Sequence, residues 1–119
     1  MKSISKELQG MMSACMQYKV QVFFERVDTD CFPKAIRPLV SLIGIDRTLQ
    51  ICLLTTKLRI PKKEATLQRN PNNPIYQILL SLPTESRTLL LMQYRGCQLN
   101  VPRFTTVWNR TLKRAGDKN

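Results

Sequence analysis

Side chains that usually carry catalysis are scarce in this sequence. It contains no histidine, which excludes Ser-His-Asp triads, Cys-His dyads and His-ligated metal sites. Its four glycines form neither a GxGxxG nor a GxxxxGKS phosphate-binding pattern. Asp28 and Asp30 are the one close pair of carboxylates, and their spacing in a predicted turn favours helix capping over acid–base catalysis. We therefore expect that the protein is not an enzyme and that it uses no cofactor.

The cysteines do not form a metal-binding pattern either. They are Cys15, Cys31, Cys52 and Cys97, and no two of them form a CxxC pair. Their apolar neighbours, clearest around the first and third, predict buried free thiols in a reducing compartment. Residues 1–10 show no signal-peptide pattern, and the apolar stretches 39–45 and 89–92 are far shorter than the roughly 18 residues of a membrane span. The sequence predicts a cytoplasmic protein without a metal site or a membrane segment.

Basic residues dominate the charged side chains and are unevenly distributed. The 119-residue chain has 19 Lys and Arg against 8 Asp and Glu, a net charge of +11. Residues 1–56 contain seven basic and five acidic side chains, whereas residues 57–119 contain twelve basic and three acidic ones. A basic half in a small protein most often meets a polyanion. We therefore expect double-stranded DNA as the partner.

Two groups of basic and polar residues are the candidate contacts to DNA. The first lies at the end of a predicted strand, where its cations can contact phosphates. The second belongs to a predicted last helix, whose arginines are spaced by 7 and 4 and share a face, with a threonine and an asparagine able to reach base edges. The candidate residues are Arg59, Lys62, Lys63, Arg103, Thr106, Asn109, Arg110, Lys113 and Arg114. Trp108, on the inner side of the same helix, is expected to be a core residue.

The elements that position these residues begin with an N-terminal helix. Apolar side chains recur at spacings of 3 and 4 over residues 4–24, which predicts one helical face, and Ser3 is a suitable N-cap. Residues 20–24 have a composition typical of strands, so the sequence leaves open whether the helix continues to its end or gives way to a strand.

Two further helices and a strand are expected next. The helices cover 33–43 and about 47–55, with Gly44 ending the first and Asp46 capping the second. Apolar and basic residues alternate over 57–61, which indicates a half-buried strand.

The second half of the chain repeats this order. Residues 62–73 are predicted to be a linker, because they end in the turn-forming string Asn-Pro-Asn-Asn-Pro. Helices are expected over 74–80 and about 83–94, followed by a strand over 98–102 and a helix over 103–114.

Three matches in the same order indicate an internal repeat. They pair 38–42 with 74–78, 47–49 with 87–89 and 58–62 with 99–103, at offsets of 36, 40 and 41 residues. We therefore predict an α+β, mostly helical fold with two helix–helix–short-strand repeats, an N-terminal helix and a C-terminal basic helix. The predicted segments of this one compact domain are 1–32, 33–63, 74–103 and 104–119.

Pairing of the two short strands determines the predicted assembly. An isolated two-stranded ribbon is marginal in water, so the strands are expected to pair within the chain or to extend a sheet with a second chain. The apolar N-terminal helix and the strand edges also favour a homodimer.

A resemblance to a known family rests on residues 39–62. Their Gly-Ile-Asp at 44–46, followed by Leu-Arg-Ile-Pro-Lys at 58–62, resembles the Mor transcription activator family of Mu-like phages, and the segments 94–96 and 101–103 are similar to the same pattern. The resemblance implies a helical dimerisation region, a short strand, a helix-turn-helix and regulation of transcription in a phage or mobile element. About 16 residues follow the second copy, which is room for one helix.

Two alternatives stay open. Residues 82–114 also look like the helix-turn-helix of sigma-factor C-terminal regions, with 84–94 as support helix, 103–114 as recognition helix and 99–101 as loop. In function, the alternative to a DNA-binding regulator is a small cationic adaptor or inhibitor that acts on an acidic host or phage protein. RNA polymerase or another protein is a further candidate partner.

Overall fold

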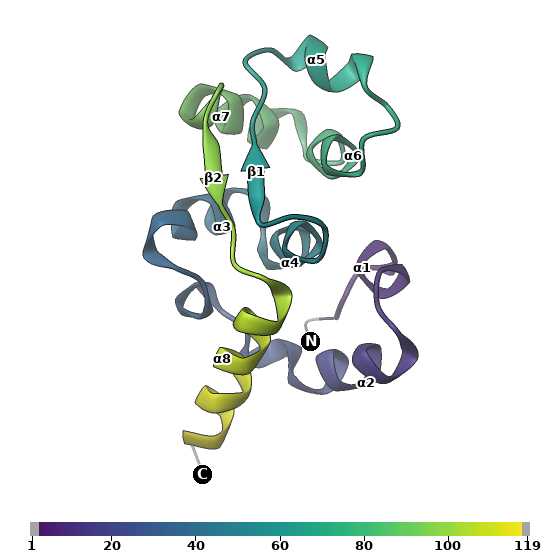
Figure 1. Cartoon of the computed structure of the whole chain (residues 1–119), viewed down its shortest axis with the longest axis vertical. Coiled ribbons are helices and arrows are strands. Elements are labelled where there is room, and N and C mark those ends of the chain that lie inside the picture. Colours follow the sequence, from purple (N-terminus) through teal and green to yellow (C-terminus); the bar gives the residue numbers. More distant parts are fainter. Residues whose placement is uncertain (1–2, 118–119) are drawn as a thin grey trace.

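The computed structural model describes residues 3–117 and shows a mostly helical α+β fold, as predicted (Figure 1). The α-helices are α1 (Lys6–Gly10), α2 (Ala14–Phe23), α3 (Arg37–Ile43), α4 (Ile45–Leu54), α5 (Glu64–Arg69), α6 (Pro74–Leu80), α7 (Thr84–Tyr94) and α8 (Phe104–Asp117). Three short 3-10 helices, η1 (Phe24–Arg26), η2 (Thr29–Cys31) and η3 (Lys34–Ile36), connect α2 to α3. The strands are β1 (Lys57–Arg59) and β2 (Gln98–Asn100).

The two strands pair with each other in an antiparallel ribbon, which settles the alternative that the sequence left open. Leu58 lies opposite Leu99 at the centre of the ribbon. Leu58 is fully buried and Leu99 is half-buried, because successive side chains of a strand point to opposite faces and these two point to the helices. One face of the ribbon therefore closes the core, and the other face is open to solvent.

The ribbon has an approximate two-fold symmetry that follows the sequence repeat. The offset of 41 residues relates Leu58 to Leu99, the two residues that pair at the centre. The amide of Ile60 donates to the carbonyl of Cys97 at 2.9 Å, and the related amide of Val101 donates to the carbonyl of Thr56 at 2.8 Å. A two-fold rotation about an axis through the centre of the ribbon approximately superposes each repeat on the other. It therefore places each of these two hydrogen bonds on the other one.

The helices follow the same approximate symmetry (Figure 1). Helix α3 packs against α7, and α4 packs against α6, so the first helix of each repeat contacts the second helix of the other. Arg47 of α4 strengthens one of these contacts, because its Nε and Nη2 donate to Oγ and the carbonyl of Ser81 at 3.0 Å each. Each repeat thus completes the core of the other, because a single unit of this size cannot bury its apolar faces alone.

The predicted linker 62–73 contains a helix, α5, so that part of the prediction is wrong. Leu67 of α5 is fully buried, and Glu64 forms an ion pair with Arg87 of α7. The turn is confined to the end of the segment, where Oδ1 of Asn73 caps α6 by accepting from the backbone amides of Ile75 and Tyr76, at 2.9 and 3.3 Å. Helix α5 follows β1 in the same way that α8 follows β2.

The N-terminal segment forms two helices instead of one. Ser13 caps α2 and interrupts the predicted helix, and Ser5 rather than Ser3 caps α1. The strand-like residues 20–24 remain helical, in α2 and the first residue of η1. The buried face of this segment, including Leu8 and Val20, belongs to the core of the same chain.

Asp46 has a different role from the predicted one. Helix α4 begins at Ile45, so Asp46 lies in its first turn and does not cap it. Its carboxylate accepts hydrogen bonds from the backbone amide and the hydroxyl of Ser5, both at 2.7 Å, and from Nε2 of Gln50 at 2.9 Å. This carboxylate connects the start of α1 to α4. Gly44, with a φ of 90°, ends α3 directly before the first residue of α4, as predicted.

The two surfaces that were expected to need a second chain, the apolar N-terminal helix and the strand edges, have partners within one chain. Ile4, Leu8 and Met12 of the N-terminal segment are buried in the core, and the strands pair with each other. The homodimer stays a prediction, but these two surfaces no longer call for it.

The cysteines differ from the prediction of four buried thiols. Cys31 and Cys52 are buried, whereas Cys15 and Cys97 are exposed. Burial raises the pKa of the Cys52 thiol to about 12, which keeps it protonated and unreactive at neutral pH.

We predict that two of the four thiols react rapidly with N-ethylmaleimide at pH 8. Cys15 and Cys97 are accessible, so peptide mapping after a short pulse should find the label on them. Cys31 and Cys52 should be labelled only after the protein is unfolded. Rapid labelling of all four thiols in the native protein would contradict this fold.

We also predict that Asp46→Ala lowers the free energy of unfolding by about 2 kcal/mol, because its partly buried carboxylate accepts three hydrogen bonds. Denaturant unfolding measures the change. Glu25→Ala is the control, since this exposed carboxylate should change stability by no more than roughly 0.5 kcal/mol. Equal stabilities of the two variants would show that the Ser5–Asp46 contact is not formed.

Candidate nucleic-acid interface

The open face of the ribbon carries four polar side chains. Lys57 and Arg59 of β1 and Gln98 and Asn100 of β2 are exposed, because they alternate with the inward-facing leucines. Lys57 pairs across the ribbon with Asn100, and Arg59 pairs with Gln98. Each pair therefore joins one cation to one amide side chain. We call these four residues the ribbon face.

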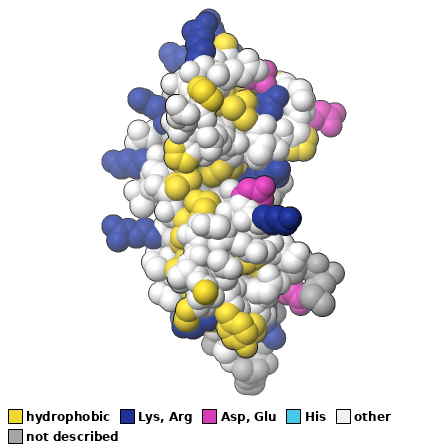
Figure 2. All heavy atoms as spheres, turned by 90° about the vertical axis from the view of Figure 1, so that its right-hand side faces the viewer, with side chains coloured by type: hydrophobic (Ala, Val, Ile, Leu, Met, Phe, Trp, Pro, Cys, Tyr) yellow, Lys and Arg dark blue, Asp and Glu magenta, His cyan; other side chains and the backbone are white. Residues whose placement is uncertain are grey.

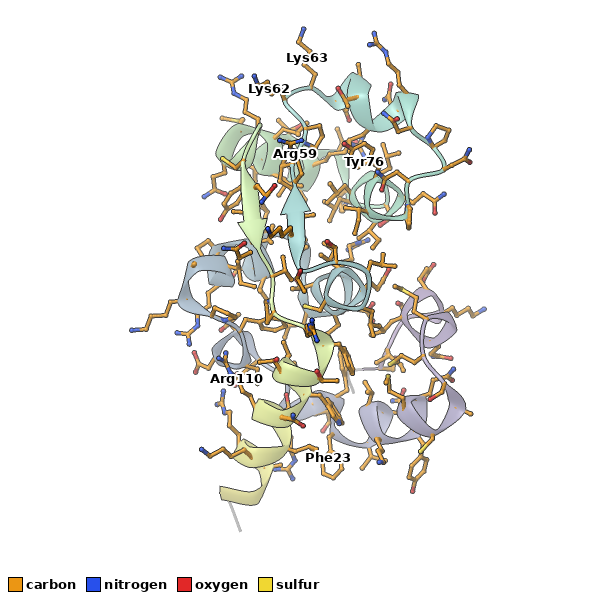
Figure 3. All side chains as sticks on the ribbon, in the orientation of Figure 1. Phe23, Arg59, Lys62, Lys63, Tyr76 and Arg110 are labelled. Carbon is orange, nitrogen blue, oxygen red and sulfur yellow. The ribbon has the colours of Figure 1, made fainter. Side chains whose placement is uncertain are left out.

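Additional cations flank the ribbon face at both ends. Lys62 and Lys63 follow β1 after a proline, and Arg103 follows β2 after a proline; all three are exposed. Figure 3 shows Lys62 and Lys63 where the chain leaves the end of β1 that carries Arg59. Since the strands are antiparallel, Lys62 and Arg103 lie at opposite ends of the ribbon. We call Lys62, Lys63 and Arg103 the flanking cations.

Gly96 positions one of the flanking cations. It adopts a φ of 73°, and its amide donates to the carbonyl of Ile60 at 2.9 Å. A Cβ at this position would lie 3.3 Å from both Cγ and Cε of Lys62, so the lysine stem runs closely over the glycine. This contact directs the Lys62 side chain along the end of the ribbon. Arg95, the exposed residue before the glycine, adds a further charge there.

Acidic residues in the part of the chain that the structure describes do not form ion pairs with the cations of this surface. Within residues 3–117, ion pairs are formed by Arg37, Arg87 and Arg114, and neither the ribbon face nor the flanking cations take part in one. Figure 2 shows Lys and Arg side chains that project in a row along its left-hand edge, the side that faces the viewer in Figure 1. The described surface thus has a row of charge available for a polyanion.

The arginines of α8 have a different environment. Nη1 of Arg114 lies 2.6 Å from Oδ1 of Asp28 and 3.9 Å from Oδ2 of Asp30, and these carboxylates raise the pKa of the guanidinium above its usual value. Nη1 of Arg110 donates to the carbonyl of Cys31 at 3.4 Å. Of the predicted arginine face, Arg114 is therefore held beside η2, Arg110 contacts η2 but stays exposed, and Arg103 precedes the helix. Arg114 is committed to an internal ion pair.

The remaining candidates of α8 are exposed but lie away from the ribbon face. They are Thr106, Asn109 and Lys113. Trp108 is half-buried, as expected for a core residue, and packs edge-on to Phe23 and parallel to Phe104, with ring centroids 6.3 and 6.2 Å apart.

The helix-turn-helix interpretation of residues 82–114 is wrong for this structure. It requires a loop over 99–101, but β2 occupies 98–100 and pairs with β1. Helix α8 packs on α4, η1 and η2, and Figure 1 shows α7 and α8 at opposite ends of the ribbon. The two helices therefore do not form a compact support-and-recognition pair.

The structure joins four predicted residues, Arg59, Lys62, Lys63 and Arg103, in one surface and separates them from the candidates on α8. Sequence reasoning missed Lys57, Arg95, Gln98 and Asn100. The alternating pattern that predicted the strands contained the signal for three of them, because polar residues beside an inward leucine must share the outer face.

Among residues 3–117, no group of three or more Cys, Asp or Glu residues is arranged to hold a metal ion. A groove of about 570 Å³ lies between α1, α4 and α6; within its lining, Oγ of Ser5 donates to Oδ1 of Asp46 and Nε of Arg47 donates to Oγ of Ser81. No helix in this part of the chain is long and apolar enough to cross a membrane.

Comparison with protein-family models, with curated proteins and with solved structures gave no significant match to this chain.

We predict that the ion pair between Arg114 and Asp28 fixes the end of α8. Arg114→Ala should lower the free energy of unfolding only slightly, because solvent screens a partly exposed pair. A double-mutant cycle with Asp28→Ala should give a positive coupling energy that falls at high salt. Lys113→Ala is the matched control on the same turn. Additive effects of the two substitutions would contradict the pairing.

Proposed function

We propose that this protein binds double-stranded DNA through the ribbon face and the flanking cations, and that it acts as a transcriptional regulator of a phage or mobile element. The observation that carries the proposal is the row of exposed, unpaired cations on and beside a two-stranded ribbon. A duplex offers regularly spaced phosphates to such a row. The net charge of the chain, +11, adds long-range attraction.

The ion pair of Arg114 favours the ribbon over α8 as the contact surface. The arginine at the end of α8 would have to leave Asp28 and Asp30 before it could neutralise a phosphate. Cations of the ribbon face have no such competing partner among the described residues. Because the gain on binding comes from counterions released by each neutralised phosphate, unpaired cations contribute most.

The regulatory part of the proposal rests on the resemblance to the Mor family. That resemblance is centred on residues 44–46 and 58–62, which in this structure form the start of α4, β1 and the first of the flanking cations. RNA polymerase or another protein is a further candidate partner of such a regulator.

We predict that Lys62→Ala combined with Arg103→Ala weakens binding to a duplex and flattens its dependence on salt. The slope of log K against log salt should decrease in magnitude by about two, or roughly 0.9 for each lost phosphate contact. Fluorescence anisotropy with a labelled duplex over a salt series measures both quantities. Thermal unfolding should change little, because both side chains are exposed.

Lys19→Ala with Lys34→Ala is the matched control. It removes the same charge from exposed positions on α2 and η3, so it should lower affinity slightly and leave the slope nearly unchanged. Equal losses in the two double variants would mean that net charge alone drives binding. Failure of the parent to bind any duplex at low salt, together with binding to an acidic protein, would favour the adaptor alternative.

A further inference from the structure

We propose that the ribbon face enters the major groove of DNA, and that one chain supplies both halves of a two-fold binding unit. This inference rests on the proposed function and specifies the groove, the stoichiometry and the symmetry of the target. It uses three observations: the dimensions of the ribbon, its approximate two-fold axis and the chemistry of its outward side chains.

The dimensions favour the major groove. Paired strands lie about 4.8 Å apart, and their side chains widen the ribbon further. The major groove is about 12 Å wide and admits a two-stranded ribbon, whereas the minor groove is only about 6 Å wide. Each strand has three residues, Lys57–Arg59 and Gln98–Asn100, and therefore spans about 10 Å, the rise of about three base pairs. Direct base contacts are thus limited to a short central sequence.

The symmetry matches that of a duplex. Proteins with a two-fold axis bind DNA sites whose halves are related by the same operation. Here the axis passes between Leu58 and Leu99 of a single chain, so no second copy is needed to generate it. The axis also relates Lys62 to Arg103, at opposite ends of the ribbon, and places one of them beside each phosphate backbone of the groove. One chain should therefore occupy one site.

The outward side chains break the symmetry in a specific way. The axis relates Lys57 to Gln98 and Arg59 to Asn100, so a cation in one repeat corresponds to an amide in the other. Lys and Arg favour the O6 and N7 acceptors of guanine, whereas Asn and Gln favour the N6 and N7 groups of adenine. The preferred centre should therefore contain both G·C and A·T pairs, related only approximately by the two-fold axis.

Duplexes selected by the protein from a random-sequence pool provide the test. Native mass spectrometry of a 12-base-pair selected duplex should give one chain per duplex. Replacement of the central purines by 7-deazapurines, which lack the N7 acceptor of the major groove, should weaken binding at least tenfold. The minor-groove ligand netropsin should not displace the protein.

Three results would overturn the inference while leaving DNA binding intact. They are two chains per minimal duplex, displacement by netropsin, and unchanged affinity for the 7-deazapurine duplex. By contrast, absence of salt-dependent binding to every duplex would mean that the proposed function itself is wrong.

A designed variant tests the assignment of the two repeats. Gln98→Lys with Asn100→Arg makes the outer face cationic in both repeats. The preferred centre should then shift towards a symmetric, G·C-rich sequence, with a steeper salt slope. The control is Gln21→Lys with Gln93→Arg, which adds the same charge at exposed positions of α2 and α7. A selected sequence that does not change in the ribbon variant, or that changes equally in the control, would contradict the assignment.

Discussion

The pairing of β1 with β2 is the interaction on which the rest of the structure depends. A two-stranded ribbon of three residues per strand has little stability by itself. It persists because its inner leucines complete a core that is formed by helices of both repeats. In return, the ribbon holds the repeats in the two-fold arrangement in which α3 meets α7 and α4 meets α6. The same pairing turns the remaining side chains of both strands outward, so the core and the proposed DNA surface arise from one alternating pattern.

The positions of the acidic residues distinguish cations that are held in ion pairs from cations that form none among the described residues. Asp28 and Asp30 lie beside α8 and hold Arg114, while Glu64 holds Arg87 between α5 and α7. These pairs attach helices to the body of the protein. The ribbon has no comparable acidic neighbour within the described residues, and its cations remain available. Arginines that pair with a carboxylate of the chain, such as Arg87 and Arg114, thus have a structural role, whereas an arginine without such a pair, such as Arg59, is available for binding.

The sequence predicted the helix–helix–strand order, the two strands and Gly44, because each depends on local patterns of two to seven residues. It did not predict that Arg114 pairs with Asp28, since the partners are 86 residues apart and no local pattern relates them. Helix α5 was missed because six residues are too few to show a helical period. The sequence repeat identified Leu58 and Leu99 as equivalent positions. It did not show that the two residues pair with each other, which follows only from the antiparallel register of the strands.

Contact between the ribbon and DNA can be measured directly through the exposed thiols of the chain. Cys97 lies immediately before β2, whereas Cys15 lies on α2. The rate of maleimide labelling of both thiols should be measured with and without saturating duplex DNA at low salt. If the ribbon contacts DNA, bound DNA should slow labelling of Cys97 at least tenfold and leave the rate at Cys15 unchanged. Equal rates at Cys97 with and without bound DNA would contradict this contact.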